Sequence, residues 1–282
     1  MIFPLIHHIF SASDLCHMPD VCLQMRPSGK LREYAKLFGF AERCCFDGVE
    51  VCCPPMNLDY ERLHLLSLEH DQPIRSVIMP GPLSPAGLLM NGKSYAYEQL
   101  DPDLLVVEVP RIAMLNWPAF RLFKNSVLLF RQTYGKEKVT VENSSPTQFQ
   151  HPVLDLKGIR DFAYEHDIFI NFDLSNCAAS GMDILLSCDM LIPRIRNVHF
   201  SDYGGQALQG HLLPGRGLLP LGMLLSRLAE YRYDGLITLE VDQGISDTEG
   251  EDPVVLYSEI VGFIKSYFSR RPRPQPSAVS SA

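Results

Sequence analysis

The sequence predicts an α/β protein built as a single (β/α)8 barrel, and two observations support this fold class. Short apolar runs rich in β-branched residues recur along the chain, and each is followed by a segment with apolar residues at helical spacing. Eight such units extend to about Phe268, which matches the content of a (β/α)8 barrel. A doubly wound sheet also fits eight strands, but no GxGxxG motif follows an early strand, which weakens its dinucleotide-binding version.

The predicted strands are mostly apolar throughout, as expected for strands covered on both faces of a parallel sheet. In chain order they are Phe3–Ile9, Gly48–Cys53, Ile74–Met79, Leu104–Val109, Lys138–Asn143, Ile168–Asp173, Arg196–Phe200 and Leu236–Val241. The N-terminal run MIFPLIHHIF lacks a basic leader and a small-residue cleavage site, so we interpret it as the first strand and not as a signal peptide.

The predicted helices lie between these strands and after the last one. They are Lys30–Glu42, Asp59–His70, Tyr95–Leu100, Trp117–Tyr134, His151–His166, Gly181–Cys188, Leu218–Tyr231 and Pro253–Phe268. We therefore expect one barrel domain over residues 1–268. The remaining residues, 269–282, are rich in Pro, Arg and Ser without apolar periodicity, which predicts a disordered tail.

Composition narrows the class of partner. The 282 residues carry 25 Lys and Arg against 33 Asp and Glu, a net charge of −8, so nucleic acid and anionic membrane surfaces are disfavoured. No apolar run approaches the ~20 residues that span a bilayer. The eight cysteines contain no CxxC pair, and no secretion signal is evident, so we expect reduced thiols and a cytoplasmic location.

Four consecutive predicted strands end in residues that bind metals. Strand five ends VTVEN with Glu142, strand six ends INFD with Asp173, strand seven contains His199, and strand eight ends ITLEV with Glu240. The reacting groups of barrel enzymes lie at these carboxyl ends. Three carboxylates and one imidazole suit a divalent ion such as Mn²⁺, Mg²⁺, Co²⁺ or Zn²⁺.

Each of these residues also has an ordinary structural interpretation. A single Glu at a strand end is commonly a solvated rim residue or a helix cap, and a single His is commonly a hydrogen-bonded packing residue. Ionisable groups in four successive apolar strands are costly to bury unless they are paired or bind metal. The four together therefore favour a metal site.

The same motifs resemble the xylose-isomerase-like TIM barrels, which include sugar-phosphate isomerases and epimerases, ketose 3-epimerases and endonuclease IV. An early segment, FGFAERCCFDGVEVCC, resembles the family's unit of a helix followed by a strand ending near a Glu, here Glu50. The other matching motifs are VEN (Val141–Asn143), NFDLSN (Asn171–Asn176), RNVHFSD (Arg196–Asp202), HLLPGRG (His211–Gly217) and YDGLITLEV (Tyr233–Val241). The resemblance implies that Glu142, Asp173, His199 and Glu240 hold one divalent metal ion.

The sequence departs from the family pattern at three places. Asn176 stands where relatives usually have a His, strand three ends with Ile78 and Met79 where a His is common, and strand four continues as VEVPR without one. In the endonuclease branch these positions bind additional zinc ions, so a trinuclear zinc nuclease is disfavoured. A divergent or inactive family member remains open.

Four further residues are predicted to contact substrate. Glu50 and Asn176 are assigned by the resemblance, and Asn176 would hydrogen-bond a substrate hydroxyl. His211 and Arg216 lie in the loop after strand seven and would reach over the barrel mouth toward a polyol or phosphate. The alternative is that the PGRG sequence only forms a turn.

The resemblance favours an isomerase or epimerase that moves a proton α to the carbonyl of a sugar, sugar phosphate or polyhydroxy acid. The intermediate would be an enediolate, with Glu142 and Glu240 as acid and base. The expected partner is a small sugar-like substrate, and homo-oligomers are common among relatives. The alternatives are an inactive barrel that acts as a binding protein and, less favoured, a phosphodiesterase like endonuclease IV.

Overall fold

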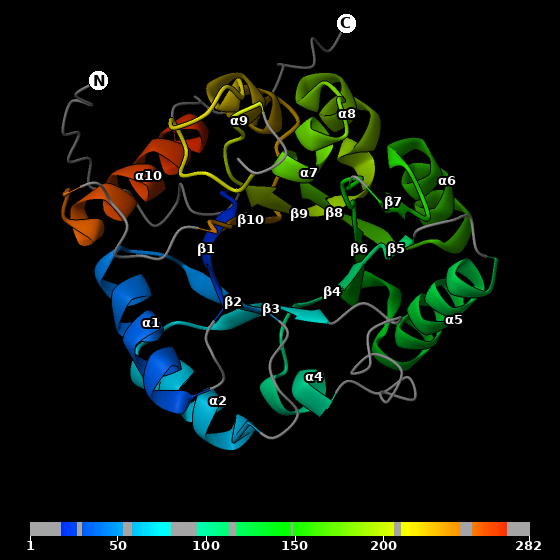
Figure 1. The fold of residues 1–282 in the computed structure, drawn as a ribbon. Helices are drawn as coiled ribbons and strands as arrows, with labels where there is room; N and C mark the ends of the chain where they lie inside the picture. Colours follow the sequence, from blue (N-terminus) through cyan, green and yellow to red (C-terminus); the bar gives the residue numbers. More distant parts are fainter. Residues whose placement is uncertain are drawn as a thin grey trace, which may run out of the picture.

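The strands form one closed, parallel, eight-stranded barrel surrounded by helices (Figure 1). This computed structural model describes residues 18–26, 30–52, 58–79, 95–112, 117–147, 149–205, 210–242 and 250–269. Going around the barrel, the strand order is β1-β10-β9-β8-β6-β4-β3-β2. The strands are β1 (Asp20–Met25), β2 (Gly48–Cys52), β3 (Ile74–Met79), β4 (Leu104–Glu108), β6 (Val139–Glu142), β8 (Phe169–Asp173), β9 (Ile195–Phe200) and β10 (Leu236–Leu239). The predicted fold class is confirmed.

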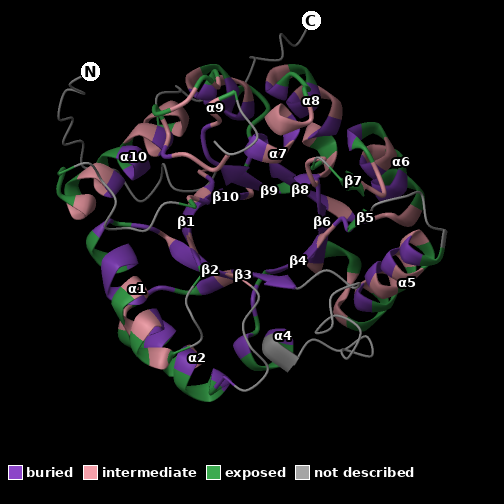
Figure 2. Cartoon of the chain, viewed as in Figure 1, coloured by how far each residue is buried: buried purple, intermediate pink, exposed green. Residues whose placement is uncertain are grey.

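The helices turn a buried face toward the barrel and an exposed face outward (Figure 2). Their apolar residues recur at helical spacing, which produces the one-sided burial. They are α1 (Leu31–Arg43), α2 (Tyr60–Glu69), α4 (Tyr95–Leu100), α5 (Trp117–Tyr134), α6 (Leu156–His166), α7 (Leu174–Ala179), α8 (Ile184–Leu191), α9 (Leu221–Glu230) and α10 (Pro253–Phe268).

The first barrel strand is β1, so its assignment to the N-terminal run was wrong. The predicted strand Phe3–Ile9 lies outside the described residues, and the barrel closes without it. Strand β1 pairs with β10 on one side, where Val21 faces Ile237, and with β2 on the other, where Leu23 faces Val49. The sequence of β1, DVCLQM, is less apolar than the N-terminal run. Its assignment depends on these long-range backbone pairings and not on hydropathy.

Other boundaries also differ from the predicted ones. Helix α6 begins at Leu156, because residues 151–152 form a short strand β7 (His151–Pro152) that pairs antiparallel with β5 (Arg111–Ile112). Strand β8 is followed directly by α7, and the predicted helix Gly181–Cys188 corresponds to α8, which begins three residues later.

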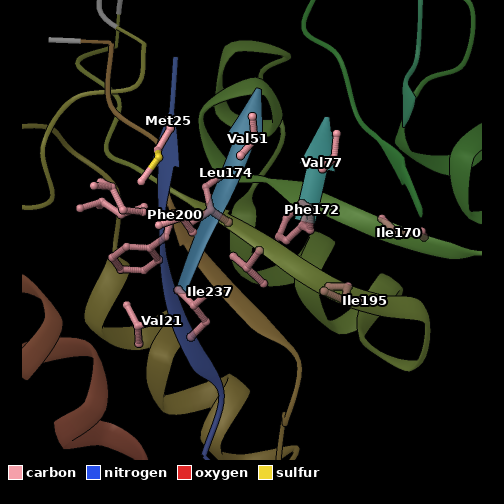
Figure 3. Close-up of a cluster of buried hydrophobic side chains, with 14 of the residues drawn as sticks. Val21, Met25, Val51, Val77, Ile170, Phe172, Leu174, Ile195, Phe200 and Ile237 are labelled. Carbon is pink, nitrogen blue, oxygen red and sulfur yellow. The ribbon is translucent and has the colours of Figure 1, made fainter. Parts of the chain in front are cut away.

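Apolar and polar residues alternate along the strands near one end of the barrel. Val51, Phe172 and Ile237 belong to the large core between the strands and the helices (Figure 3). Polar residues between the apolar ones point into the barrel: Nδ2 of Asn197, next to the buried Val198 on β9, donates to Oε2 of Glu50, next to Val51 on β2, although these strands are not neighbours. Alternation of this kind sends successive side chains to opposite faces. The expectation of strands apolar throughout therefore does not hold at this end, where the interior is polar.

The predicted tail, 269–282, lies outside the described residues apart from Ser269, which caps the end of α10. Within the part of the chain that the structure describes, no helix is both long enough and apolar enough to cross a membrane.

Candidate functional site

The four predicted metal ligands lie together at the carboxyl end of the barrel. Glu142 and Asp173 are the last residues of β6 and β8, His199 is the last but one of β9, and Glu240 follows β10 directly. None of the four is more than 4% exposed. Burying charged groups is costly unless they are paired, so this grouping requires a physical compensation.

Potential ligand atoms form two overlapping groups. One group contains Glu142, Asp173 and His199, and the other contains Asp173, His211 and Glu240. Within each group the ligand atoms all lie within 4.8 Å of one another. The structure thus brings the four predicted ligands together and adds His211, which the sequence suggested only as a substrate contact.

The imidazole of His199 is surrounded by carboxylates. Its Nδ1 lies 2.7 Å from Oε2 of Glu240 and 3.4 Å from Oε2 of Glu142. Nevertheless Nδ1 of His199 and Oε2 of Glu240 are buried atoms without a hydrogen-bond partner. A cation bound between this buried nitrogen and this buried carboxylate oxygen would give both atoms a partner. Together with the oxygen-rich donor set, they fit a divalent metal ion.

The electrostatics of the cluster are unbalanced without such a cation. Burial raises the pKa of Glu142 well above its usual range, and His199 offsets this only in part. Burial likewise raises the pKa of Asp173 to about 6. The pKa of His199 is raised because the neighbouring carboxylates outweigh burial, which acts in the opposite direction. For Glu240, burial acts to raise the pKa, but His199, His211 and Arg26 outweigh it and lower the pKa.

Glu50 lies beside Nε2 of His199, the nitrogen that does not face Glu142 and Glu240, and it has no exposed surface. Its Oε1 lies 2.9 Å from Nε2 of His199 and accepts a hydrogen bond from Gln24 at 3.0 Å. Its Oε2 accepts hydrogen bonds from Ser76 at 2.6 Å and Asn197 at 3.2 Å. Glu50 was predicted to contact substrate, but the structure surrounds it with protein. A carboxylate behind a ligating histidine is the usual arrangement that orients the ring.

Asp173 is held from two sides. Its side chain caps the start of α7 by accepting from the backbone N–H of Asn176 at 2.8 Å, and Nδ2 of Asn176 donates to its other oxygen at 2.7 Å. The Asn143 side chain bonds both the N–H and the C=O of Asp173. The structure therefore places Asn176, predicted to bind substrate, in contact with a potential metal ligand.

The loop after β9 is organised by Asp202. This buried carboxylate accepts hydrogen bonds from the backbone N–H groups of Tyr203, Gly215 and Leu219. The loop positions His211, whose Nδ1 lies 3.8 Å from Oε1 of Glu240.

Arg216, in the same loop, pairs with Glu251 at 3.0 Å, just before α10. Its side chain is 41% exposed. Pro214 and Gly215 form a turn that continues as a bend at Arg216 and Gly217, as the structural interpretation expected. Contact between Arg216 and substrate remains a prediction.

Arg26 and Glu108 are among the residues at this end that were not predicted. Arg26 follows β1 and forms ion pairs with Glu240 and Asp242. Glu108 ends β4 and faces Glu142 in the register of the neighbouring strand. The strand-end rule that identifies Glu142 also applies to Glu108, in the motif VEVPR. Arg26 follows a strand that hydropathy does not predict.

Comparison with known proteins agrees with the sequence motifs. Residues 131–267 match the family model described as xylose isomerase-like TIM barrel. An uncharacterized protein of Mycobacterium tuberculosis (strain ATCC 25618 / H37Rv) is 25% identical over 265 residues, covering 83% of this chain and 92% of that protein.

Solved structures with the same fold include two epimerases. The 3-keto-D-glucoside 4-epimerase YcjR from E. coli has a TM-score of 0.66 at 16% identity, covering 88% of this chain and 99% of its own. The D-allulose 3-epimerase from Methylomonas sp. has a TM-score of 0.69 at 14% identity, covering 89% and 98%. These likenesses concern the fold. The family match over residues 131–267 and the closed barrel agree with the similarity of the sequence motifs to the xylose isomerase-like TIM barrels.

Proposed function

We propose that this protein is a metal-dependent isomerase or epimerase of a small sugar, sugar phosphate or polyhydroxy acid. The observation that carries the proposal is the buried cluster of Glu142, Asp173, His199 and Glu240, with its unbonded atoms on His199 and Glu240. The epimerases of the same fold support the class of reaction.

The four clustered residues would hold one divalent ion, with His211 close enough to contribute. When bound, such an ion polarises carbonyl and hydroxyl oxygens as a Lewis acid. Glu50 and Asn176 orient His199 and Asp173 through the contacts described above. The burial of the cluster excludes water and strengthens every electrostatic interaction within it.

Glu142 and Glu240 are the proposed acid and base. They come from β6 and β10, and both approach Nδ1 of His199, so they converge on one point from separate strands. One carboxylate would remove the proton from the carbon α to the carbonyl, and the other would return a proton. Return to the opposite face of that carbon gives an epimer, whereas return to the adjacent carbon gives an isomer.

The test combines metal analysis with proton exchange. We expect the purified protein to bind one Mn²⁺, Co²⁺ or Zn²⁺ per chain and, once loaded, to exchange solvent deuterium into some member of a panel of ketoses, ketose phosphates and hydroxy-keto acids. Glu142→Gln should abolish exchange without unfolding the barrel. Glu69→Gln, on the exposed Arg62 ion pair, is the matched control and should exchange normally. Substantial exchange by Glu142→Gln would contradict the assignment of Glu142.

A second candidate is a binding protein that works without metal. The observation that favours it is the ion pair between Arg26 and Glu240, because a guanidinium already supplies positive charge to one ligand. This alternative predicts that no divalent ion binds under any loading condition. The metal analysis therefore separates the two candidates before any substrate is known.

A further inference from the structure

Five side chains form a closed ring of contacts that joins the barrel mouth to the buried ligands. Nε of Arg26 donates to Oε1 of Gln24, and Nε2 of Gln24 donates to Oε1 of Glu50 at 3.0 Å. That same oxygen of Glu50 lies 2.9 Å from Nε2 of His199. Nδ1 of His199 lies 2.7 Å from Oε2 of Glu240, and Oε1 of Glu240 accepts from Arg26, which closes the ring.

Arg26 is the exposed member of this ring. Its side chain is 45% exposed, whereas Glu50, His199 and Glu240 are at most 2% exposed. Asp242, the second acid bound by Arg26, lies 3.1 Å from its Nη1 and fixes the guanidinium at the mouth.

The two oxygens of Glu240 have different surroundings. Oε1 receives the hydrogen bond from Arg26, while Oε2 is buried, lacks a hydrogen bond and faces His199. The guanidinium thus occupies one oxygen and leaves the other directed at the ligand cluster. Carboxylates that ligate metals are commonly hydrogen-bonded in this way by an outer partner, which fixes their orientation.

We infer that Arg26 is a positioning residue for the metal centre. Through Nη2 it orients Glu240, and through Nε, Gln24 and Glu50 it orients the ring of His199. One side chain therefore controls two ligands that belong to neighbouring strands, β9 and β10. The planar guanidinium of an arginine can donate to Glu240 and to Gln24 at the same time, whereas a lysine ammonium is a single point of charge. The inference rests on the proposed metal-dependent function.

The test measures Mn²⁺ affinity by calorimetry in the full chain, together with the electron paramagnetic resonance spectrum of bound Mn²⁺. Arg26→Gln should weaken Mn²⁺ binding by about 10–100-fold, as loss of an outer-shell partner typically does, and should change the spectrum. Arg26→Lys should restore part of the affinity, because it keeps the charge beside Glu240. Arg62→Gln, which removes an exposed ion pair with Glu69, should bind Mn²⁺ as the wild type does.

Gln24→Leu breaks the link from Arg26 to Glu50 and His199 but keeps Arg26 and its ion pair with Glu240. This variant should also weaken Mn²⁺ binding. The double variant with Arg26→Gln should lose less Mn²⁺-binding free energy than the sum of the two single losses, because both substitutions break the same ring of contacts.

Unchanged or tighter Mn²⁺ binding by Arg26→Gln would overturn the inference, because tighter binding would mean that Arg26 competes with the metal for Glu240. If the wild type itself binds no divalent ion, the proposed function fails first. If the wild type binds Mn²⁺ and Arg26→Gln binds it equally well, only the positioning role fails.

Discussion

Oε1 of Glu50 lies 2.9 Å from Nε2 of His199, although the strands that carry them, β2 and β9, are not neighbours in the barrel. Both side chains are completely buried. The contact spans the interior and leaves the opposite nitrogen of the imidazole facing Glu142 and Glu240. It therefore sets which nitrogen the histidine offers to the cluster.

Replacing Glu50 should be costly to folding. Glu50→Ala removes one partner of a buried charged pair, so the free energy of unfolding should fall by about 3–5 kcal/mol. Urea denaturation measures this change. Glu69→Ala, at an exposed ion pair, should change stability by less than about 1 kcal/mol. Similar small effects for both variants would show that Glu50 does not hold His199.

The metal-free protein should gain stability when Asp173 is replaced by Asn. The pKa of Asp173 in the folded state is about 6, above its ordinary value of 3.8, so between about pH 4 and 6 the folded state binds more protons than the unfolded chain. The contribution of Asp173 to stability therefore falls as the pH rises through this window.

Asp173→Asn removes the free-energy cost of ionising this buried carboxyl and keeps a residue type that caps helices well. The difference in free energy of unfolding between Asp173→Asn and wild type should grow in favour of the variant by up to roughly 3 kcal/mol as the pH rises from 4 to 7. Denaturation of both metal-free proteins across this range measures the difference. A constant difference at all pH values would contradict the assignment of the titration to Asp173.

The loop that carries His211 should be sensitive at Gly217. A Cβ atom there would lie 2.4 Å from Oδ1 of the buried Asp202 and 2.7 Å from the backbone nitrogen of Tyr203. Gly217→Ala should therefore cost about 1–3 kcal/mol, by thermal or urea unfolding. Gly262→Ala, at an exposed position of α10 with nothing within 4 Å, should instead stabilise by about 0.5–1 kcal/mol. A neutral Gly217→Ala would mean that the loop rearranges freely.

Divalent metal should stabilise the folded protein through the cluster. At a free metal concentration of 100 times the dissociation constant, the gain in unfolding free energy is about 2.7 kcal/mol. Calorimetric unfolding with added Mn²⁺, and again after chelation, measures this gain. Glu240→Gln should lose most of it. An equal gain in wild type and variant would indicate that Mn²⁺ acts elsewhere on the protein.

Much of the site could be predicted from local sequence. Glu142, Asp173 and Glu240 end or follow strands whose apolar residues are evident, and parallel strands of a barrel bring their carboxyl ends to one rim. The alternation along VTVE, INFD and ITLE also fixes which residues turn inward, because the side-chain period of a strand is two. Their grouping in space follows from these local facts once the fold class is known.

Only the tertiary structure shows which residues form the first strand and which side-chain contacts follow from its position. Hydropathy favoured Phe3–Ile9, but hydrogen bonding of Asp20–Met25 to both β2 and β10 closes the barrel. That closure places Arg26 beside Glu240, a residue 214 positions away in the sequence. The ring through Gln24 and Glu50 likewise joins strands distant along the chain. The sequence alone determined the barrel and its strand-end ligands, because these follow from local periodicity, whereas the partners of those ligands depend on contacts that only the closed fold creates.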